Sequence, residues 1–383
     1  MKTGAVIAEY NIFHNGHKFL LDHVRKNCDA VIAVMSGNMV QRGDVAITDK
    51  WTRAKMALLN GADLVIELPV IYALNTAQKF AFGAVNIINS LNIADELYFG
   101  SESGDIDELI RAAKLIENEP VHISEKIKQF LDEGMSYPSA RQKAYEGDLN
   151  DILKTPNNIL AIEYIRSLMQ LKSNIIPKTV SRTGTGYHDM HTYDNIASAS
   201  AIRDMIKNRE DFSKYIPKNI SPDFTQYDLS NIDSAIIYTL RNTDAEYIKS
   251  INDVSEGLEN RIKKLSAEFG TAQSLCENIK TKRYTRTRIN RVILSCVLGL
   301  TQELCSKTPS YIRVLGMNKT GMKLLSEIKN KSDFSIVTKT ADYSRDDDIF
   351  NAEIRATDLF SLACNDSEKR ISGLDFINSP VII

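Results

Sequence analysis

The fold is decided by residues 4–17, Gly-Ala-Val-Ile-Ala-Glu-Tyr-Asn-Ile-Phe-His-Asn-Gly-His. The first six are mostly small and apolar, and short continuous apolar runs are typical of strands that are covered on both faces. A polar turn with one glycine follows and leads into an amphipathic stretch, so the segment predicts a strand, a turn and a helix. Similar apolar runs follow at 30–35, 62–67, 95–99 and 177–181.

Amphipathic segments separate these runs, at 17–27, 49–60, 76–91 and 105–118. Alternating strands and helices predict an α/β fold, a Rossmann-like doubly wound parallel sheet whose ligand site lies at the carboxyl ends of its strands. From Pro217 onward the pattern is mostly helical, and the strongest helical period covers 289–300. We therefore expect an α/β domain at 1–215 and a mostly helical region at 216–383. After Tyr311 the pattern is mixed and predicts no element.

Composition limits the kind of protein. The 383 residues include 47 Lys and Arg against 49 Asp and Glu, a balance that excludes a uniformly basic nucleic-acid-binding protein. The five cysteines are far apart and form neither a CxxC pair nor a zinc spacing, so we expect reduced thiols, no metal site and a cytoplasmic location. No secretory pattern or bilayer-length apolar stretch appears, so no membrane association is expected. Nothing indicates the oligomeric state.

Two histidines lie in the turn after the first predicted strand, in His14-Asn-Gly-His17. A helix start offers backbone N–H groups and the positive end of the helix dipole, both of which attract phosphate. Gly16 allows close approach of the backbone to a ligand. Both imidazoles can donate hydrogen bonds to phosphate oxygens, most strongly where charge develops on an α-phosphate. A metal-binding pair or two surface histidines are the alternatives.

A second segment with phosphate-binding character is Ser198-Ala-Ser-Ala-Ile-Arg203. Ser198 or Ser200 can cap a helix and leave N–H groups for phosphate. Arg203 can bind phosphate oxygens through two parallel hydrogen bonds. The alternative is an ordinary capped helix with a surface arginine.

A dense basic segment precedes the helix predicted at 289–300. RNA phosphates are its expected targets, with an interleaved tyrosine available to stack on an unpaired base. A solvated, positively charged helix face is the alternative. The predicted RNA-binding residues are Lys280, Lys282, Arg283, Tyr284, Arg286, Arg288 and Arg291.

These motifs resemble those of a known superfamily. Residues 14–17 resemble the HxGH motif of nucleotidyltransferases and class I aminoacyl-tRNA synthetases, and 198–203 resemble their ISSTxIR element. The absence of a KMSKS-like loop argues against a synthetase proper. An ordered series of longer motifs is similar to the bacterial tRNA(Met) cytidine acetate ligase family: Glu9 to His17, Met35-Ser-Gly-Asn-Met-Val-Gln-Arg-Gly43, Phe99 to Gly104, Pro156 to Leu160, Arg182 to Asp189 and Lys280 to Arg288.

The resemblance implies a nucleotidyltransferase-like domain at 1–215 that binds ATP and acetate, and a mostly helical region at 216–383 that binds tRNA. It also implies a two-step reaction. Acetate attacks the α-phosphate of ATP, accompanied by Mg²⁺, and gives acetyl-adenylate and pyrophosphate. The N4 amine of the wobble cytidine (C34) in elongator tRNA(Met) then takes the acetyl group, giving N4-acetylcytidine and AMP. The catalytic residues implied are His14, His17 and Arg203. No covalent acyl-enzyme is expected, because the mixed anhydride is already activated and no nucleophile pair is evident.

The resemblance also implies an ATP site, and its single residues keep other interpretations. Gly100 leaves room for adenine or ribose, or is a turn glycine. Asn157 binds ligand or caps a helix, and Arg182 clamps phosphate or lies on the surface. The implied ATP-binding residues are Ile7, Ala8, Glu9, Tyr10, Asn11, Ile12, Phe13, His14, Asn15, Gly16, His17, Lys18, Phe19, Leu20, Gly100, Asn157, Arg182, Ser198 and Ser200.

Two other functions remain open from the sequence. A different HxGH-type nucleotidyltransferase would adenylylate a small metabolite and would need no RNA. A non-catalytic RNA-binding protein with a vestigial nucleotide fold would bind tRNA without ATP turnover, although the intact His14, His17 and Arg203 argue against it.

Overall fold

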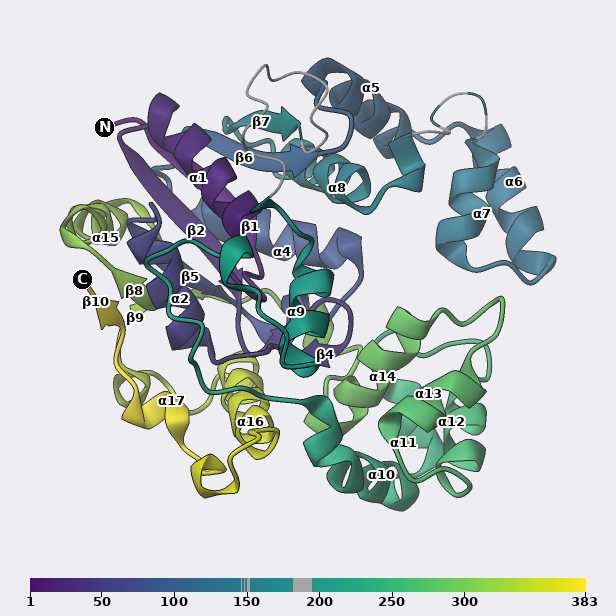
Figure 1. Cartoon of the computed structure of the whole chain (residues 1–383). Helices are drawn as coiled ribbons and strands as arrows, with labels where there is room; N and C mark the ends of the chain where they lie inside the picture. The colour runs from purple at the N-terminus through teal and green to yellow at the C-terminus, as the bar shows by residue number, and fades with distance from the viewer. Residues whose placement is uncertain (146, 148, 150–151, 182–194) are drawn as a thin grey trace.

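The protein is described by a computed structural model that covers residues 1–145, 147, 149, 152–181 and 195–383. Its centre is a sheet with the strand order β10-β8-β5-β2-β1-β6-β7, with β9 beside β8 (Figure 1). A separate hairpin pairs β3 with β4. The strands are β1 (Thr3–Ala8), β2 (Ala30–Ser36), β3 (Met39–Val40), β4 (Asp44–Val45), β5 (Leu64–Leu68), β6 (Glu96–Ser101), β7 (Ile176–Ser181), β8 (Tyr311–Met317), β9 (Ser335–Val337) and β10 (Val381–Ile382).

The five strands predicted from apolar runs are confirmed as β1, β2, β5, β6 and β7, and they are parallel to one another. β1 lies between β2 and β6, with Gly4 opposite Val31 on one side and Glu96 on the other. The carboxyl ends of these strands therefore share one edge, where α/β sheets of this type bind ligands.

Both faces of the sheet are covered, because consecutive strand residues point to opposite sides. Ala5 joins one buried cluster and its neighbour Val6 joins the other. On the Val6 side lie α1 (Asn15–Asn27), α2 (Lys50–Leu59) and α9 (Ala199–Lys207). On the Ala5 side lie α3 (Val70–Ala73), α4 (Ala77–Ser90), α5 (Ile106–Glu117), α6 (Val121–Asp132), α7 (Tyr137–Ala144), α8 (Pro156–Gln170) and α15 (Lys319–Lys331).

The C-terminal part of the chain is mostly helical, as expected for residues 216–383, but it also contributes strands to the sheet. β8 is buried along its whole length and pairs antiparallel with β5, which makes the sheet mixed. β9 and β10 then pair with β8 in parallel. A boundary at residue 215 therefore does not separate sheet from helices. The assignment of separate ATP-binding and RNA-binding roles to the two regions stays a prediction.

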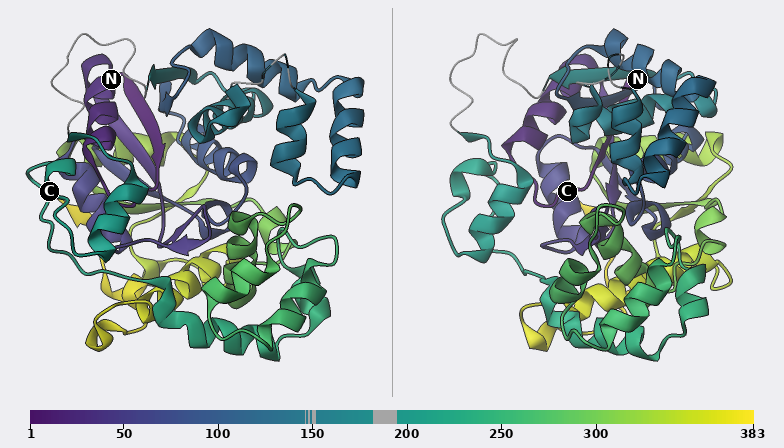
Figure 2. Two further views of the ribbon diagram at one scale, coloured as in Figure 1. Left: turned by 45° about the vertical axis from the view of Figure 1, so that its right-hand side comes forward. Right: turned by 90° about the vertical axis from the view of Figure 1, so that its right-hand side faces the viewer.

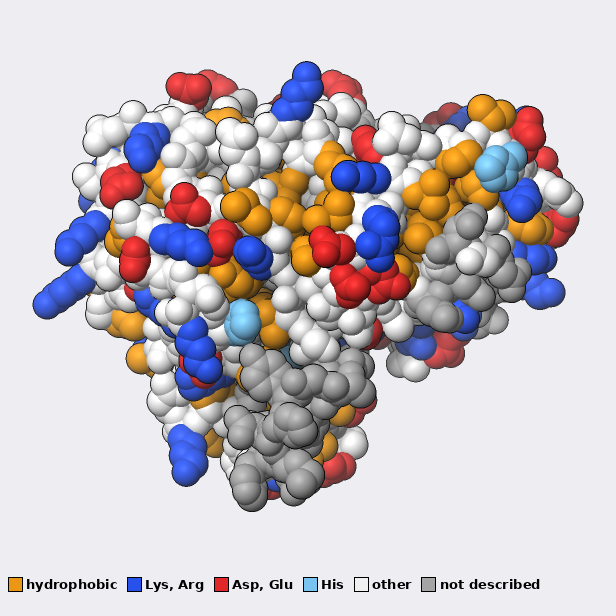
Figure 3. Space-filling view, turned by 90° about the horizontal axis from the view of Figure 1, so that it is seen from above, with side chains coloured by type: hydrophobic (Ala, Val, Ile, Leu, Met, Phe, Trp, Pro, Cys, Tyr) orange, Lys and Arg blue, Asp and Glu red, His pale blue; other side chains and the backbone are white. Residues whose placement is uncertain are grey.

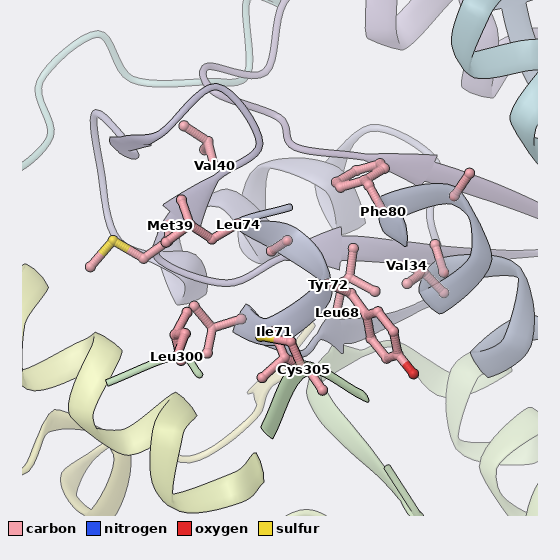
Figure 4. Packing of buried hydrophobic residues seen from close by; sticks show 14 of the residues in the cluster. Val34, Met39, Val40, Leu68, Ile71, Tyr72, Leu74, Phe80, Leu300 and Cys305 are labelled. Atoms are coloured by element: carbon pink, nitrogen blue, oxygen red, sulfur yellow. The ribbon is translucent and has the colours of Figure 1, made fainter. Parts of the chain in front are cut away.

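A helical lobe precedes β8 and packs below the sheet (Figures 1 and 2). Leu300 and Cys305, at the end of this lobe, lie beside Ile71 and belong to the same buried cluster as the sheet residues (Figure 4). The lobe and the sheet thus share one core. Its helices are α10 (Asp233–Asn242), α11 (Ala245–Ser250), α12 (Leu258–Ser266), α13 (Ala272–Ile279) and α14 (Arg286–Leu298), and α16 (Asp348–Leu362) and α17 (Leu374–Ile377) follow β9.

A buried network of charges joins the C-terminal elements to the sheet. Lys50 Nζ lies 2.7 Å from Glu67 Oε1 and 2.8 Å from Asp375 Oδ1. Arg313 of β8 binds the same two carboxylates, at 3.3 and 2.8 Å. Glu353 lies at the edge of this network, with its Oε1 3.9 Å from Lys50 Nζ. Burial and repulsion from Glu67 raise the pKa of Glu353 well above its ordinary value.

Candidate active site

The turn between β1 and α1 fixes both histidines of the HxGH-like motif. The Gly16 N–H donates to His14 Nδ1 over 3.0 Å, and the His14 N–H donates to His17 Nδ1 over 3.3 Å. Because each Nδ1 accepts a hydrogen bond, the proton of each neutral ring lies on Nε2. The rings stack with their centroids 3.7 Å apart. The turn therefore holds two Nε2–H donors side by side at a helix N-terminus.

The residues around the turn restrict the positions of both imidazole rings. The rings of Tyr10 and Phe13 lie 5.0 and 5.6 Å from the ring of His17. A Cβ on Gly16 would lie 2.9 Å from His14 Cε1, so a larger residue would displace that ring. Asn15 Nδ2 donates to the carbonyl oxygens of Asn195 and Lys214, which ties the turn to the segment around α9.

Arg203 reaches the same turn from α9. Its guanidinium donates to the backbone oxygen of Asn11 and, over 3.2 Å, to Ser200 Oγ. Ser198 caps α9 through a hydrogen bond from Ala201 N–H. Burial lowers the pKa of Arg203, although the nearby carboxylate of Glu9 opposes this effect. The structure thus brings together the two motifs that the sequence singled out.

Arg53 of α2 supports the turn, and the sequence analysis missed it. The side chain is completely buried and donates to the carbonyl oxygens of Glu9, Ser36 and Thr48, at 2.7, 3.1 and 3.0 Å, and also to that of Gly37. These hydrogen bonds therefore hold the ends of β1 and β2 together. The signal for this role in the sequence is that Arg53 shares a helix face with the apolar residues of α2. An unpaired cation buried there would cost free energy, so buried hydrogen-bond partners are expected.

Glu9 directly follows β1, and its backbone oxygen is one of the acceptors of Arg53. Its Oε1 accepts a hydrogen bond of 2.7 Å from the Gln41 N–H, which attaches the β3–β4 hairpin to β1. Burial raises the pKa of Glu9, and the Gln41 bond and the charge of Arg203 only partly offset that effect.

The other predicted ATP-binding residues lie on several elements: Ile7 and Ala8 on β1, Ile12 in the turn, Lys18, Phe19 and Leu20 on α1, Gly100 on β6 and Asn157 on α8. Gly100 of β6 pairs with Val180 of β7. Asn157 Nδ2 donates to Glu102 Oε1 over 2.5 Å, and the next N–H, of Asn158, donates to Glu102 Oε2. Burial would raise the pKa of Glu102, but these bonds outweigh it and hold the pKa below its ordinary value. Arg182 lies outside the described residues.

No three His, Cys, Asp or Glu side chains in the described ranges are placed to hold a metal ion. In the same ranges, no helix is both long enough and apolar enough to cross a membrane. All five cysteines are buried and none forms a disulfide.

Comparisons with known proteins agree with this geometry. A family model described as HIGH Nucleotidyl Transferase matches residues 1–373. A tRNA(Met) cytidine acetate ligase of Thermoanaerobacter sp. (strain X514) is 42% identical, with 97% of this chain and 98% of that protein covered. One from Clostridium tetani is 39% identical with both chains fully covered.

The chain belongs to the tRNA(Met) cytidine acetate ligase family. The crystal structure of Thermotoga maritima TmcAL bound with alpha-thio ATP matches the whole chain, with a TM-score of 0.89 and 31% identity. That ligase and this chain therefore share one fold, including the mixed sheet.

In this family member, Arg283 of the predicted RNA-binding segment is half-buried, and the five other basic residues fall into two groups. Lys280, Lys282 and Arg286 are exposed. Arg288 instead donates to Asp253 O and Ser255 Oγ, and Arg291 binds Asp253 Oδ2 at 2.8 Å. On the opposite face of the molecule, seen from above in Figure 3, positive and negative side chains are interspersed. The first group has the exposure that phosphate contacts need, whereas the second ties α14 to the loop before α12.

Tyr284 does not offer its ring for base stacking, contrary to the sequence prediction. Only 7% of the residue is exposed, and its hydroxyl donates to the backbone oxygen of Glu256 over 2.6 Å. The guanidinium of Arg288 lies 5.6 Å from the ring centroid. Because the ring is buried and its hydroxyl is bonded to the backbone, the ring cannot at the same time stack on an RNA base.

Proposed function

We propose that this protein is an ATP-dependent acetate ligase that forms N4-acetylcytidine at the wobble cytidine of elongator tRNA(Met). The observation that carries the proposal is the pair of Nε2–H donors at the start of α1, with Arg203 bound to the same turn. Family membership supports acetate and tRNA as the substrates.

In the first step, the α1 N-terminus and the two imidazoles bind the ATP phosphates. An acetate oxygen attacks the α-phosphorus, and the bond to pyrophosphate breaks with its electron pair on the leaving group. His14, His17 and Arg203 stabilise the negative charge that develops on the α-phosphate. Because both rings are held by backbone hydrogen bonds, these donors need no rearrangement during the reaction.

The side chains at the turn suit phosphate better than Mg²⁺. Imidazole Nε2–H and guanidinium groups are donors, whereas Mg²⁺ takes oxygen ligands and keeps several waters. Mg²⁺ would therefore be held by the ATP phosphates and water, and it would neutralise part of their charge.

In the second step, the cytidine N4 attacks the acetyl carbonyl and AMP leaves. Lys280, Lys282 and Arg286 supply exposed positive charge for the tRNA backbone. Such an enzyme works where tRNA and ATP meet, in the cytoplasm.

A matched pair of transcripts tests this proposal. Elongator tRNA(Met) and a variant with uridine at position 34 are incubated with ATP, labelled acetate and the enzyme. Label is expected in the first transcript alone. Acetate-dependent pyrophosphate release without label in either RNA would instead indicate adenylylation for another acceptor.

A further inference from the structure

A groove runs along α9 away from the phosphate-binding turn. Its smaller part, about 160 Å³, is lined by Ser200 and Arg203 of α9 and by Asp44 of β4. Its larger part, about 520 Å³, extends to Phe212 and Asn365. The two parts form one continuous space, the α9 groove, because both are lined by Ile47, Lys207, Tyr227 and Asp228.

The α9 groove has side chains that can bind the edge of an unpaired base. Gln226 and Asn365 line it and supply side-chain amides. Phe212 and Tyr227, each 8% exposed, form an apolar wall rather than a stacking surface. The ring of Tyr227 is itself stacked on Phe360, with 3.9 Å between the ring centroids. Hydrogen bonds to base edges are one of the ways in which proteins recognise single-stranded nucleotides.

Asp44 lies where the groove meets Arg203. Its Oδ1 accepts a hydrogen bond of 2.8 Å from the Val45 N–H, which orients the carboxylate. No residue of the described ranges donates a hydrogen bond to its Oδ2. Burial raises the pKa of Asp44, and the charges of Lys207 and Arg203 offset this only in part. A carboxylate with a raised pKa is a stronger proton acceptor.

The hairpin that carries Asp44 lies between the ATP turn and the RNA-binding segment. On one side, Gln41 of this hairpin is bound to Glu9 at the end of β1. On the other side, Gly43 packs so closely on α14 that a Cβ there would lie 2.4 Å from Arg291 N. The hairpin that carries Asp44 therefore contacts both the end of the ATP-binding strand and the helix that follows the basic segment.

We propose that the α9 groove binds the acceptor cytidine and that the Asp44 carboxylate accepts a hydrogen bond from its N4 amino group. This inference rests on the proposed function. Carboxylates select cytosine by this contact, because its N4 amine is a donor where uracil has a carbonyl oxygen.

The same contact gives the transfer step a proton acceptor. The N4 lone pair attacks the acetyl carbonyl carbon, and a C–N bond forms. The bond from that carbon to the adenylate oxygen breaks, and AMP leaves with the electron pair. The proton lost by N4 passes to Asp44 and from there to water.

Adding synthetic acetyl-adenylate allows acetyl transfer to be measured without the activation of acetate by ATP. Wild type, Asp44→Asn and Asp44→Glu are given synthetic acetyl-adenylate and tRNA(Met), and N4-acetylcytidine is measured by mass spectrometry. Asp44→Asn should transfer acetyl about 100-fold more slowly, with acetate-dependent ATP–pyrophosphate exchange within about twofold of wild type. Asp44→Glu should recover part of the loss. Asp223→Asn, which alters an exposed carboxylate in the segment before Tyr227, is the control for the change in charge.

The outcomes are distinct. Asparagine keeps the size of the side chain and an acceptor for Val45, and an unchanged thermal midpoint verifies the fold. Wild-type transfer by Asp44→Asn overturns the role of Asp44. Equal loss of exchange and transfer in a folded variant also overturns it, because Asp44 would then act in the first step. Failure of wild type to acetylate RNA from acetyl-adenylate would instead refute the proposed function, and this inference with it.

Discussion

The turn at residues 14–17 and the basic segment at residues 280–291 behave differently in the structure. In the turn, both histidines are oriented by backbone groups of the same few residues. In the basic segment, Arg288 and Arg291 are bound by Asp253 and its neighbours, which lie more than thirty positions earlier. A motif whose geometry is local can be interpreted from sequence, whereas the availability of a charge depends on partners that sequence spacing does not reveal.

The largest effect is expected from His17→Ala. Loss of one preorganised donor at a developing charge typically costs about 100- to 1,000-fold in rate. Acetate-dependent ATP–pyrophosphate exchange should fall by that factor, while tRNA affinity should stay within about twofold. His122→Ala, at an exposed histidine of α6, should leave both unchanged. Exchange at the wild-type rate in His17→Ala would contradict the role assigned to the turn.

Arg53→Met tests how the turn is supported. The substitution leaves the carbonyl oxygens of Glu9, Ser36 and Thr48 without this donor, and each buried unsatisfied group costs about 1–3 kcal/mol. The free energy of unfolding should therefore fall by about 3 kcal/mol or more in urea titrations. Lys55→Met, at an exposed position of the same helix, is the matched control. Equal stability of the two variants would show that Arg53 does not hold the strand ends together.

The exposed group of the basic segment is tested by replacing Lys280, Lys282 and Arg286 with Ala. Three lost phosphate contacts should flatten the salt dependence of tRNA binding by about 2 in the log–log slope. Pyrophosphate exchange with acetate should persist. A control triple of Lys126, Lys128 and Lys323, exposed residues of α6 and α15, should keep the wild-type slope. If both triples give the same slope, this segment is only a solvated face.

The smallest effect is expected from Tyr284→Phe. The variant loses only the hydrogen bond to Glu256 O, which contributes about 1 kcal/mol to stability. Its tRNA affinity should match that of wild type in filter binding. Tyr284→Leu should lose more stability, because the packing of the ring is lost as well. Unchanged stability of both variants together with weaker tRNA binding would restore the stacking role that the buried ring argues against.

The sequence predicted the parallel strands because each is a continuous apolar run of its own. β8 was not predicted, because Tyr311-Ile-Arg-Val-Leu-Gly-Met317 contains an arginine whose burial depends on Glu67 and Asp375. Prediction of the site residues has the same limit. His14, His17 and Arg203 lie in short motifs that can be identified in the sequence. The roles of Arg53 and Asp44 depend on carbonyl groups and cavity walls on other elements, which the sequence does not reveal.

If this chain uses ATP to place acetate on a cytidine of tRNA, the product can be detected directly. The enzyme is incubated with ATP, labelled acetate and bulk bacterial tRNA, and the nucleosides are analysed by mass spectrometry. We expect labelled N4-acetylcytidine that requires ATP. Absence of the label from RNA, with tRNA bound and ATP intact, would contradict it.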